Sequence, residues 1–169
     1  MPLVLDDFSA DTDTTTRRWS MFTDQVMGGV SEGSAALEMI LGRRALRLRG
    51  RVSLERNGGF VQVARPLGNG PASPLDARQY AGLAITVCGR PGPYFIHLRT
   101  PDARAPWQYY AAALPVKTTW TDVLLRWADF TPESLQRALD VSRLQRLGVV
   151  AAKEAFAADI AIAKIALVP

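Results

Sequence analysis

A strict alternation of apolar and polar side chains in short segments is the feature that most constrains the fold. In ALRLRGRVSL, residues 45–54, the apolar face carries Leu46, Leu48, Val52 and Leu54. The opposite face carries Arg47, Arg49, Arg51 and Ser53. Because successive side chains of a β-strand point to opposite faces, this pattern predicts a half-buried strand whose arginines face solvent.

Further short segments have strand character, and clusters of Gly, Pro, Asn and Asp separate them. They are GFVQVARPL (59–67), AGLAITVCG (81–89), PYFIHLRT (93–100), WQYYAAALP (107–115), WTDVLLRW (120–127), LGVVAA (147–152) and ADIAIAKIALV (158–168). In the last segment, the phase set by Ile160 and Ile162 is broken at Ile165. We therefore expect a β-bulge near Ala163–Lys164. The whole pattern is typical of an all-β antiparallel sandwich.

Helical signals are few. Thr131 offers an N-cap and Pro132 the first helical position, which predicts a short helix over SLQRAL, residues 134–139. A second, single turn is expected to begin at Asp140. The N-terminal region carries four carboxylates, at Asp6, Asp7, Asp11 and Asp13. They lack the glycine of a calcium-binding loop and are interleaved with threonines, so we expect a solvated loop there.

Composition places the chain among globular proteins. It has 169 residues, of which 48% are hydrophobic and 21% charged, and we expect one domain over residues 1–169. Cys88 is the only cysteine, so no internal disulfide can form and a cytoplasmic, reducing compartment fits best. The N-terminus MPLVLDDF has no secretory pattern, and no segment reaches the roughly 20 apolar residues of a membrane span.

Motifs of catalysis are nearly absent. His97 is the only histidine, which excludes metal sites built on two histidines and most histidine relays. Cys88 lies in a strand segment and is interpreted as a small buried hydrophobe. Neither glycine pair of the chain matches a phosphate-binding loop. We therefore expect no enzyme activity, no metal, no cofactor and no nucleic-acid partner.

Arginines give the chain its net charge of +4, and Arg47, Arg49 and Arg51 crowd one segment. Two interpretations stand for this basic face: an ordinary solvated surface, or a contact with an anionic partner. The aromatic residues are similarly open, because Trp107, Tyr109, Trp120 and Trp127 fit either a packed core or a platform for sugars. Tyr109 and Tyr110 must point to opposite faces, so one of them is expected in the core.

Two glycine loops stand out: TDQVMGGVSEG at 23–33 and NGGF at 57–60. Adjacent glycines usually serve positive φ angles or close approach of backbones, and their polar neighbours supply hydrogen bonds. These loops either lock the fold or bind a ligand. Phe95, His97 and Arg99 share one face of their strand, and we expect Asp24 to be the partner that Arg99 needs.

The two loops, taken together, resemble the paired signatures of the complex I intermediate-associated protein family, which are TDQVMGGVS and NGGFVQV here. Later segments keep the family's order: FIHLRT, then Tyr-Tyr-Ala at 109–111, WTDVLLRWADF and LQRLGVVAAKEA. The similarity runs from Asp7 to Ile165. The chain departs from the family at Gln25, where a second acidic residue is common, and at Ala161 and Ala163, where the last strand often carries acids.

The resemblance implies a galactose-binding-like jelly-roll β-sandwich and a non-catalytic role in assembling respiratory NADH:ubiquinone oxidoreductase. The implied partners are complex I subunits or assembly intermediates, with peripheral contact to membrane complexes. The alternative that we keep is a module that binds carbohydrate or another small ligand. The residues that we expect to contact a ligand or partner are Asp24, Met27, Gly28, Gly29, Ser31, Asn57, Gly58, Gly59, Phe60, His97, Arg99 and Tyr109, with Arg47, Arg49 and Arg51 as a basic face.

Overall fold

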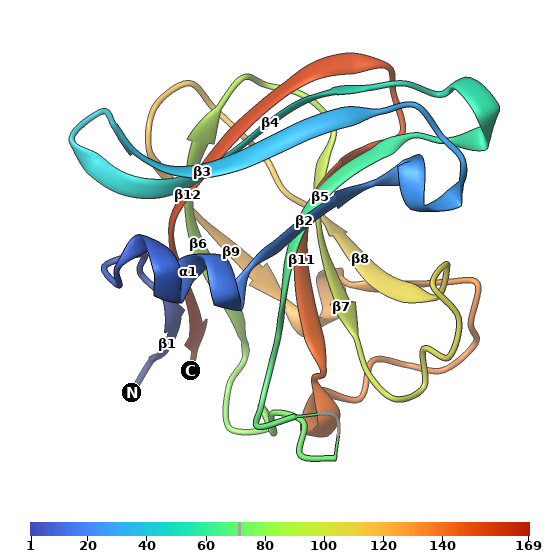
Figure 1. Ribbon diagram of the computed structural model, residues 1–169. Coiled ribbons are helices and arrows are strands. Elements are labelled where there is room, and N and C mark those ends of the chain that lie inside the picture. Colours follow the sequence, from blue (N-terminus) through green and yellow to red (C-terminus); the bar gives the residue numbers. More distant parts are fainter. Residues whose placement is uncertain (71) are drawn as a thin grey trace.

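The computed structural model describes residues 1–70 and 72–169, which form two antiparallel sheets packed face to face (Figure 1). Sheet A has the order β3-β4-β12-β6-β9, and β1 also pairs with β12. Its strands are β3 (Glu32–Ile40), β4 (Arg43–Val52), β12 (Phe156–Val168), β6 (Gly82–Gly89), β9 (Thr121–Arg126) and β1 (Leu3–Asp6). Sheet B has the order β10-β8-β7-β11-β5-β2. Its strands are β10 (Thr131–Glu133), β8 (Tyr109–Ala113), β7 (Tyr94–Arg99), β11 (Arg146–Ala152), β5 (Phe60–Pro66) and β2 (Ser20–Thr23).

The core lies between the sheets and is built from alternate residues of each strand. Leu48 and Ile85 of sheet A are buried against residues such as Ile96 and Val149 of sheet B. The prediction of an all-β sandwich is confirmed. Its strand segments recur as β4 to β9, β11 and β12, and Tyr110 points into the core as expected, whereas Tyr109 points away from it.

Strand β4 has the predicted phase. Leu46, Leu48 and Val52 are buried, whereas Arg49 and Arg51 are exposed. The exception is Leu54, which we expected on the buried face and which is 49% exposed. That expectation was wrong because β4 ends at Val52, so the alternation no longer fixes the direction of Leu54.

The predicted irregularity in β12 is confirmed. The register between β12 and β6 shifts between Ile162 and Lys164, next to Ala163. This shift lets Ile160 and Ile162 on one side of the bulge, and Ile165 on the other, all pack into the core.

Two predictions about helices were wrong. Residues 134–139, where we expected a helix, are not helical. The residues expected to cap it, 131–133, form the edge strand β10 because pairing with β8 outweighs a local cap signal. The expected N-terminal loop contains the helix α1 (Thr12–Arg18). Asp11 caps this helix by accepting a hydrogen bond from the Thr14 amide at 2.7 Å, and Arg17 and Arg18 lie in its last turn.

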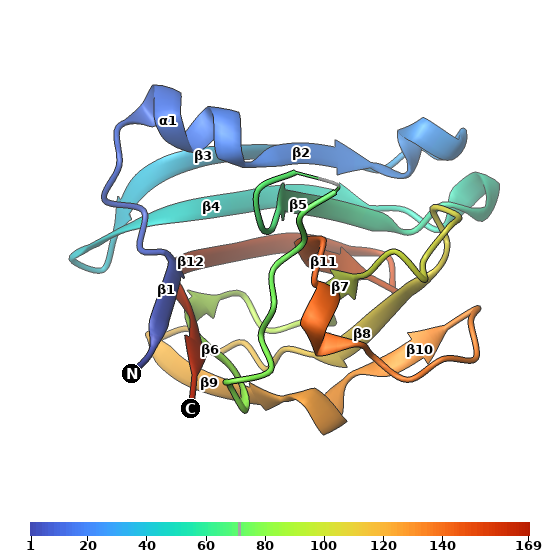
Figure 2. The ribbon, with the colours of Figure 1, turned by 90° about the horizontal axis from the view of Figure 1, so that it is seen from below.

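In the described part of the chain, four single 3₁₀ turns connect strands: η1 (Asp24–Met27), η2 (Glu55–Asn57), η3 (Trp127–Asp129) and η4 (Val141–Arg143). The last confirms the turn that we expected after Asp140. Turns η1 and η2, which belong to the two glycine loops, lie together at the end of the sandwich away from the two chain termini (Figures 1 and 2). None of the helices among the described residues is long and apolar enough to cross a membrane.

Candidate functional site

The two glycine loops are joined through the Asp24 carboxylate, which is fully buried. Its Oδ1 accepts a hydrogen bond from the Ser31 amide at 2.9 Å. Its Oδ2 accepts from the Ser31 hydroxyl and from the amides of Gly59 at 2.5 Å and Phe60 at 3.2 Å. Ser31 in turn accepts from the Ser53 amide at 2.9 Å. One carboxylate therefore ties η1 to the start of β5.

The glycines make room for this carboxylate. A Cβ atom added to Gly29 would lie 2.3 Å from Asp24 Oδ1, and one added to Gly58 would lie 2.6 Å from Oδ2. The other member of each pair has a positive φ, +87° at Gly28 and +139° at Gly59, which side chains rarely tolerate. In each glycine pair, one residue must lack a side chain to make room for Asp24, and the other must adopt a positive φ angle.

Burial raises the pKa of Asp24, but the hydrogen bonds from Ser31, Gly59 and Phe60 outweigh it and leave the pKa below its ordinary value. The group is ionised at neutral pH and its acceptor capacity is used by the two loops. Asp24 and Ser31 are accordingly buried in the connection between the loops, whereas Gly29 is partly exposed and Gly28 is exposed.

Beside this connection, the face of sheet B that points away from the core carries a cleft of about 550 Å³. Its floor is made by β11, β5 and β7, and its rim by η1, η2 and the loop before β8. The lining residues are Phe22, Val26, Met27, Leu54, Asn57, Gly58, Gly59, Phe60, Gln62, Phe95, His97, Arg99, Pro106, Tyr109, Arg146, Gly148, Val150, Ala152 and Lys153. The cleft is therefore largely apolar and aromatic.

Small residues of β11 leave room on the floor for larger side chains of the neighbouring strands β5 and β7. Gly148 is opposite His97, and a Cβ at Gly148 would lie 2.1 Å from the side-chain oxygen of Gln62. The His97 ring stacks on Tyr109, with centroids 3.9 Å apart. Burial, helped by the charge of Lys153, lowers the pKa of His97 to about 3, so the imidazole is neutral at pH 7.

The charged side chains of the cleft are all cationic. Arg146 and Arg99 are direct cross-strand neighbours between β11 and β7. The Arg146 guanidinium lies 5.1 Å from the centre of the Phe22 ring, and the Lys153 ammonium 5.0 Å from that of Phe95. Arg99 donates to the carbonyls of Ala103 at 3.1 Å and Pro106 at 3.3 Å. Among the described residues that line the cleft, none is Asp or Glu.

The rim presents exposed apolar side chains. Val26 is 70% exposed, Met27 56% and Leu54 49%. Val26 and Met27 belong to η1, and Leu54 directly precedes η2 in the β4–β5 connection, whose end Asp24 holds. Loop geometry and cleft shape are thus coupled: the buried carboxylate holds the segments that carry the apolar rim.

The structure separates the predicted site residues into three groups. The cleft brings together Met27, Asn57, Gly58, Gly59, Phe60, His97, Arg99 and Tyr109. Asp24, Gly28, Gly29 and Ser31 belong to the adjoining loop but do not line the cleft, and Arg47, Arg49 and Arg51 lie on sheet A. The expected pairing of Arg99 with Asp24 was wrong, since Arg99 donates to backbone carbonyls and Asp24 is occupied by backbone amides and a hydroxyl.

Several lining residues were missed, above all Arg146, Gly148 and Lys153. Gln62 could have been found from the alternation of β5, where it shares a face with Phe60. In β11 the residues after Arg146 form the continuous run LGVVAA, so no alternation marks its cleft face. Only the pairing of β11 between β5 and β7 shows that it forms the floor.

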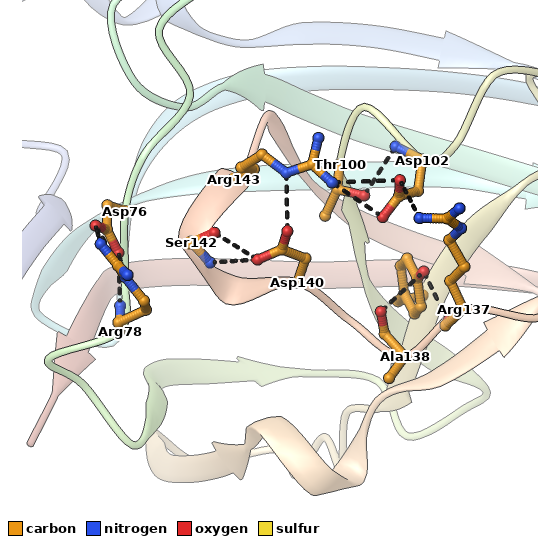
Figure 3. Close-up of polar contacts among 10 residues, drawn as sticks. Asp76, Arg78, Thr100, Asp102, Arg137, Ala138, Asp140, Ser142 and Arg143 are labelled. Atoms are coloured by element: carbon orange, nitrogen blue, oxygen red, sulfur yellow. Dashed lines mark hydrogen bonds and ion pairs between the residues drawn. The ribbon is translucent and has the colours of Figure 1, made fainter.

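Other charged groups satisfy one another. Arg47 donates to Asp159 at 2.8 and 2.6 Å and to Glu38 at 3.3 Å, so the basic face carries internal counter-charges. Figure 3 shows a second cluster, in which Arg143 bridges Asp140 at 2.8 Å and Asp102 at 3.3 Å. Within residues 1–70 and 72–169, no group of three His, Cys, Asp or Glu side chains is placed to hold a metal ion.

Solved structures similar to this chain include carbohydrate-binding modules. The family 11 module of the cellulosomal cellulase Lic26A-Cel5E of Clostridium thermocellum has a TM-score of 0.78 at 11% identity, covering 99% of this chain and 94% of that one. A family 30 carbohydrate-binding module has a TM-score of 0.65 at 14% identity, covering 100% and 89%. An exo-β-agarase has a TM-score of 0.62 at 10% identity, covering 99% of this chain and 25% of the agarase. These likenesses show the fold.

No curated protein sequence matches the chain significantly. In contrast, the sequence profile of complex I intermediate-associated protein 30 matches residues 7–161, which include both glycine loops and every strand of the cleft. The chain therefore belongs to the complex I intermediate-associated protein 30 family.

Proposed function

We propose that this chain is a non-catalytic binding protein that holds a protein partner in the cleft of sheet B. By its family, the partner is a subunit or assembly intermediate of respiratory NADH:ubiquinone oxidoreductase. In this role the protein covers an apolar segment of the partner and makes peripheral contact with a membrane complex. It binds and releases the partner without chemistry.

The observation that carries the proposal is the apolar rim of the cleft. Val26, Met27 and Leu54 stand exposed around a preformed hollow that is itself lined by aromatic rings. Exposed apolar groups that gather at one concave site, rather than scattering singly, are typical of a surface that a partner covers. Because the buried Asp24 carboxylate holds the loops that carry these side chains, less conformational entropy is lost when a partner binds.

A carbohydrate ligand is the second candidate, and the stacked rings of His97 and Tyr109 favour it because sugars pack on flat aromatic surfaces. The similarity in fold to carbohydrate-binding modules also supports a carbohydrate ligand. Sugar hydroxyls both donate and accept, however, so they also need acceptors. Asn57, Gln62 and Tyr109 supply acceptors in the cleft, whereas its charged groups, Arg99, Arg146 and Lys153, offer only donors. The exposed apolar rim is what favours the protein partner.

Affinity co-purification from the native host, after gentle membrane solubilisation, tests the proposal. Wild type is compared with a Val26→Ser, Leu54→Ser variant, which removes two apolar rim side chains. The matched control is Met39→Ser, Leu41→Ser, because these residues are similarly exposed, at 69% and 66%, in and beside the β3–β4 turn.

We expect complex I subunits with wild type and with the control, and a loss of at least tenfold with the rim variant. Equal recovery of complex I subunits with all three proteins would show that the rim of the cleft does not contact them. Recovery of no subunit, together with binding of a neutral glucan oligosaccharide in calorimetry, would replace the proposal with the carbohydrate candidate.

A further inference from the structure

At one end of the cleft floor, two arginines occupy directly opposed positions of neighbouring strands. Arg146 and Arg99 are direct neighbours across the β7–β11 pair, and both side chains line the cleft. Like charges at directly opposed positions of a sheet repel each other. Burial lowers the pKa of both guanidinium groups, and the charge of Arg146 lowers that of Arg99 further. The charge of Arg146 therefore disfavours the charged form of Arg99.

The described residues supply no counter-charge to Arg146. Its guanidinium is placed over the Phe22 ring, and burial alone shifts its pKa. Glu133 lies opposite Tyr109 on the edge strand β10, but it does not line the cleft. The basic face of sheet A differs in this respect, because Arg47 and Arg49 there are paired with Glu38. An anion supplied from outside would relieve the repulsion at Arg146 and Arg99.

The rest of the cleft requires an apolar body attached to that anion. Beyond Arg146 the floor consists of Gly148, Val150 and Ala152, and aromatic rings flank it. Lys153 follows at the far end. At the rise of a β-strand, the six steps from Arg146 to Ala152 span about 20 Å. That length corresponds to about six residues of extended peptide.

From these features we infer that the cleft recognises an extended, apolar peptide segment of its partner that carries a carboxylate, which the guanidinium of Arg146 binds. The inference rests on the proposed function and specifies the chemistry of the partner. A guanidinium binds a carboxylate through two parallel hydrogen bonds, which gives direction to the bound segment. The apolar side chains of the segment then contact the cleft floor and the Val26–Leu54 rim.

Two naphthalene dyes test the anion site directly. 8-Anilinonaphthalene-1-sulfonate carries an anion on an apolar body, and N-phenyl-1-naphthylamine has the same body without the charge. We expect Arg146→Gln to weaken binding of the sulfonate about tenfold and binding of the neutral dye less than twofold. Arg146→Lys, which keeps the charge but loses the paired hydrogen bonds of the guanidinium, should weaken binding of the sulfonate less than Arg146→Gln does. Arg51→Gln is the matched control, because Arg51 is an exposed arginine on sheet A.

A random peptide library displayed on phage then tests the occupant, with selection on wild type and on Arg146→Gln. Enrichment of apolar peptides that contain Asp, Glu or a free C-terminal carboxylate, on wild type alone, is the expected result. Peptides without carboxylates, or the same peptides on both proteins, would overturn the inference. So would an absence of peptides together with Arg146-dependent binding of an acidic oligosaccharide.

The two proposals fail in different ways. If complex I subunits co-purify equally well with wild type and Arg146→Gln but not with the rim variant, the proposed function stands and the carboxylate site falls. If no subunit co-purifies while acidic peptides bind through Arg146, the partner named by the family falls and the chemistry of the cleft stands.

Discussion

Removal of the Asp24 carboxylate is the sharpest perturbation of the structure that holds the cleft. Asp24→Ala deprives four donors of their acceptor: the amide and hydroxyl of Ser31 and the amides of Gly59 and Phe60. Water can reach Gly59 and Phe60, which are partly exposed, and the Ser31 hydroxyl keeps the Ser53 carbonyl as an acceptor at 3.2 Å. The Ser31 amide is buried and is left without a partner.

From these contacts we expect Asp24→Ala to lower the free energy of unfolding by about 2–4 kcal/mol, most of it from the orphaned Ser31 amide. Asp24→Asn should recover little, although it has the same shape. Both carboxylate oxygens accept from N–H or O–H donors, so an amide nitrogen in either position would face a donor.

Urea denaturation at pH 7 measures the effect, with Glu55→Ala as the control for loss of an exposed carboxylate in the adjacent loop. The folded-state pKa of Asp24 is below its ordinary value of 3.8, so its contribution is complete above that pH and is lost as the pH falls below it. The difference in unfolding free energy between wild type and Asp24→Ala should therefore narrow as the pH falls below 3.8. A midpoint for Asp24→Ala equal to that of wild type at pH 7 would refute the reasoning.

Three further outcomes follow from the same structure. Gly58→Ala places a Cβ 2.6 Å from Asp24 Oδ2, so it should lower the free energy of unfolding of wild type by about 1–3 kcal/mol. The same substitution should lower it less in the Asp24→Ala background. Equal losses in the two backgrounds, measured by urea denaturation, would speak against the contact. The His97 imidazole, with a pKa of about 3, should not titrate between pH 5 and 8 by NMR, and a midpoint near 6.5 would contradict its burial against Tyr109. Because the unfolded imidazole binds a proton below pH 6.5 and the folded one does not, this group lowers stability as the pH falls towards 3. Burial raises the pKa of the Cys88 thiol, so a thiol reagent should modify native protein far more slowly than unfolded protein; equal rates would place Cys88 at the surface.

The sequence predicted the fold well where local patterns and tertiary pairing agree. The alternation of Leu46, Arg47 and Leu48 and the bulge beside Ala163 are both found in the structure. Prediction failed where pairing at a distance decides the outcome. Residues 131–133 look like a helix start but pair with β8, and the threonine-rich segment 12–18 is helical. That helix lies between Phe8 and Trp19, whose buried rings contact each other at a centroid distance of 5.7 Å.

The candidate site was predicted only in part for a similar reason. The two glycine loops are local motifs and could be recognised as a pair, although their polar groups turned out to hold Asp24 rather than Arg99. The cleft depends on which strands become neighbours. Arg146 and Arg99 are 47 positions apart in the chain, and only the antiparallel register of β7 and β11 brings them together.

Site-specific photocrosslinking in the native host tests the central claim, that the cleft face of sheet B meets the partner, most directly. A benzophenone side chain is introduced at Val26 on the cleft rim or at Met39 on sheet A, where the native residues are 70% and 69% exposed. Irradiation followed by mass spectrometry identifies the captured proteins. We expect crosslinks to complex I subunits or assembly intermediates from Val26 and none from Met39. Crosslinks to such subunits from Met39 alone would rule out the cleft as the contact surface.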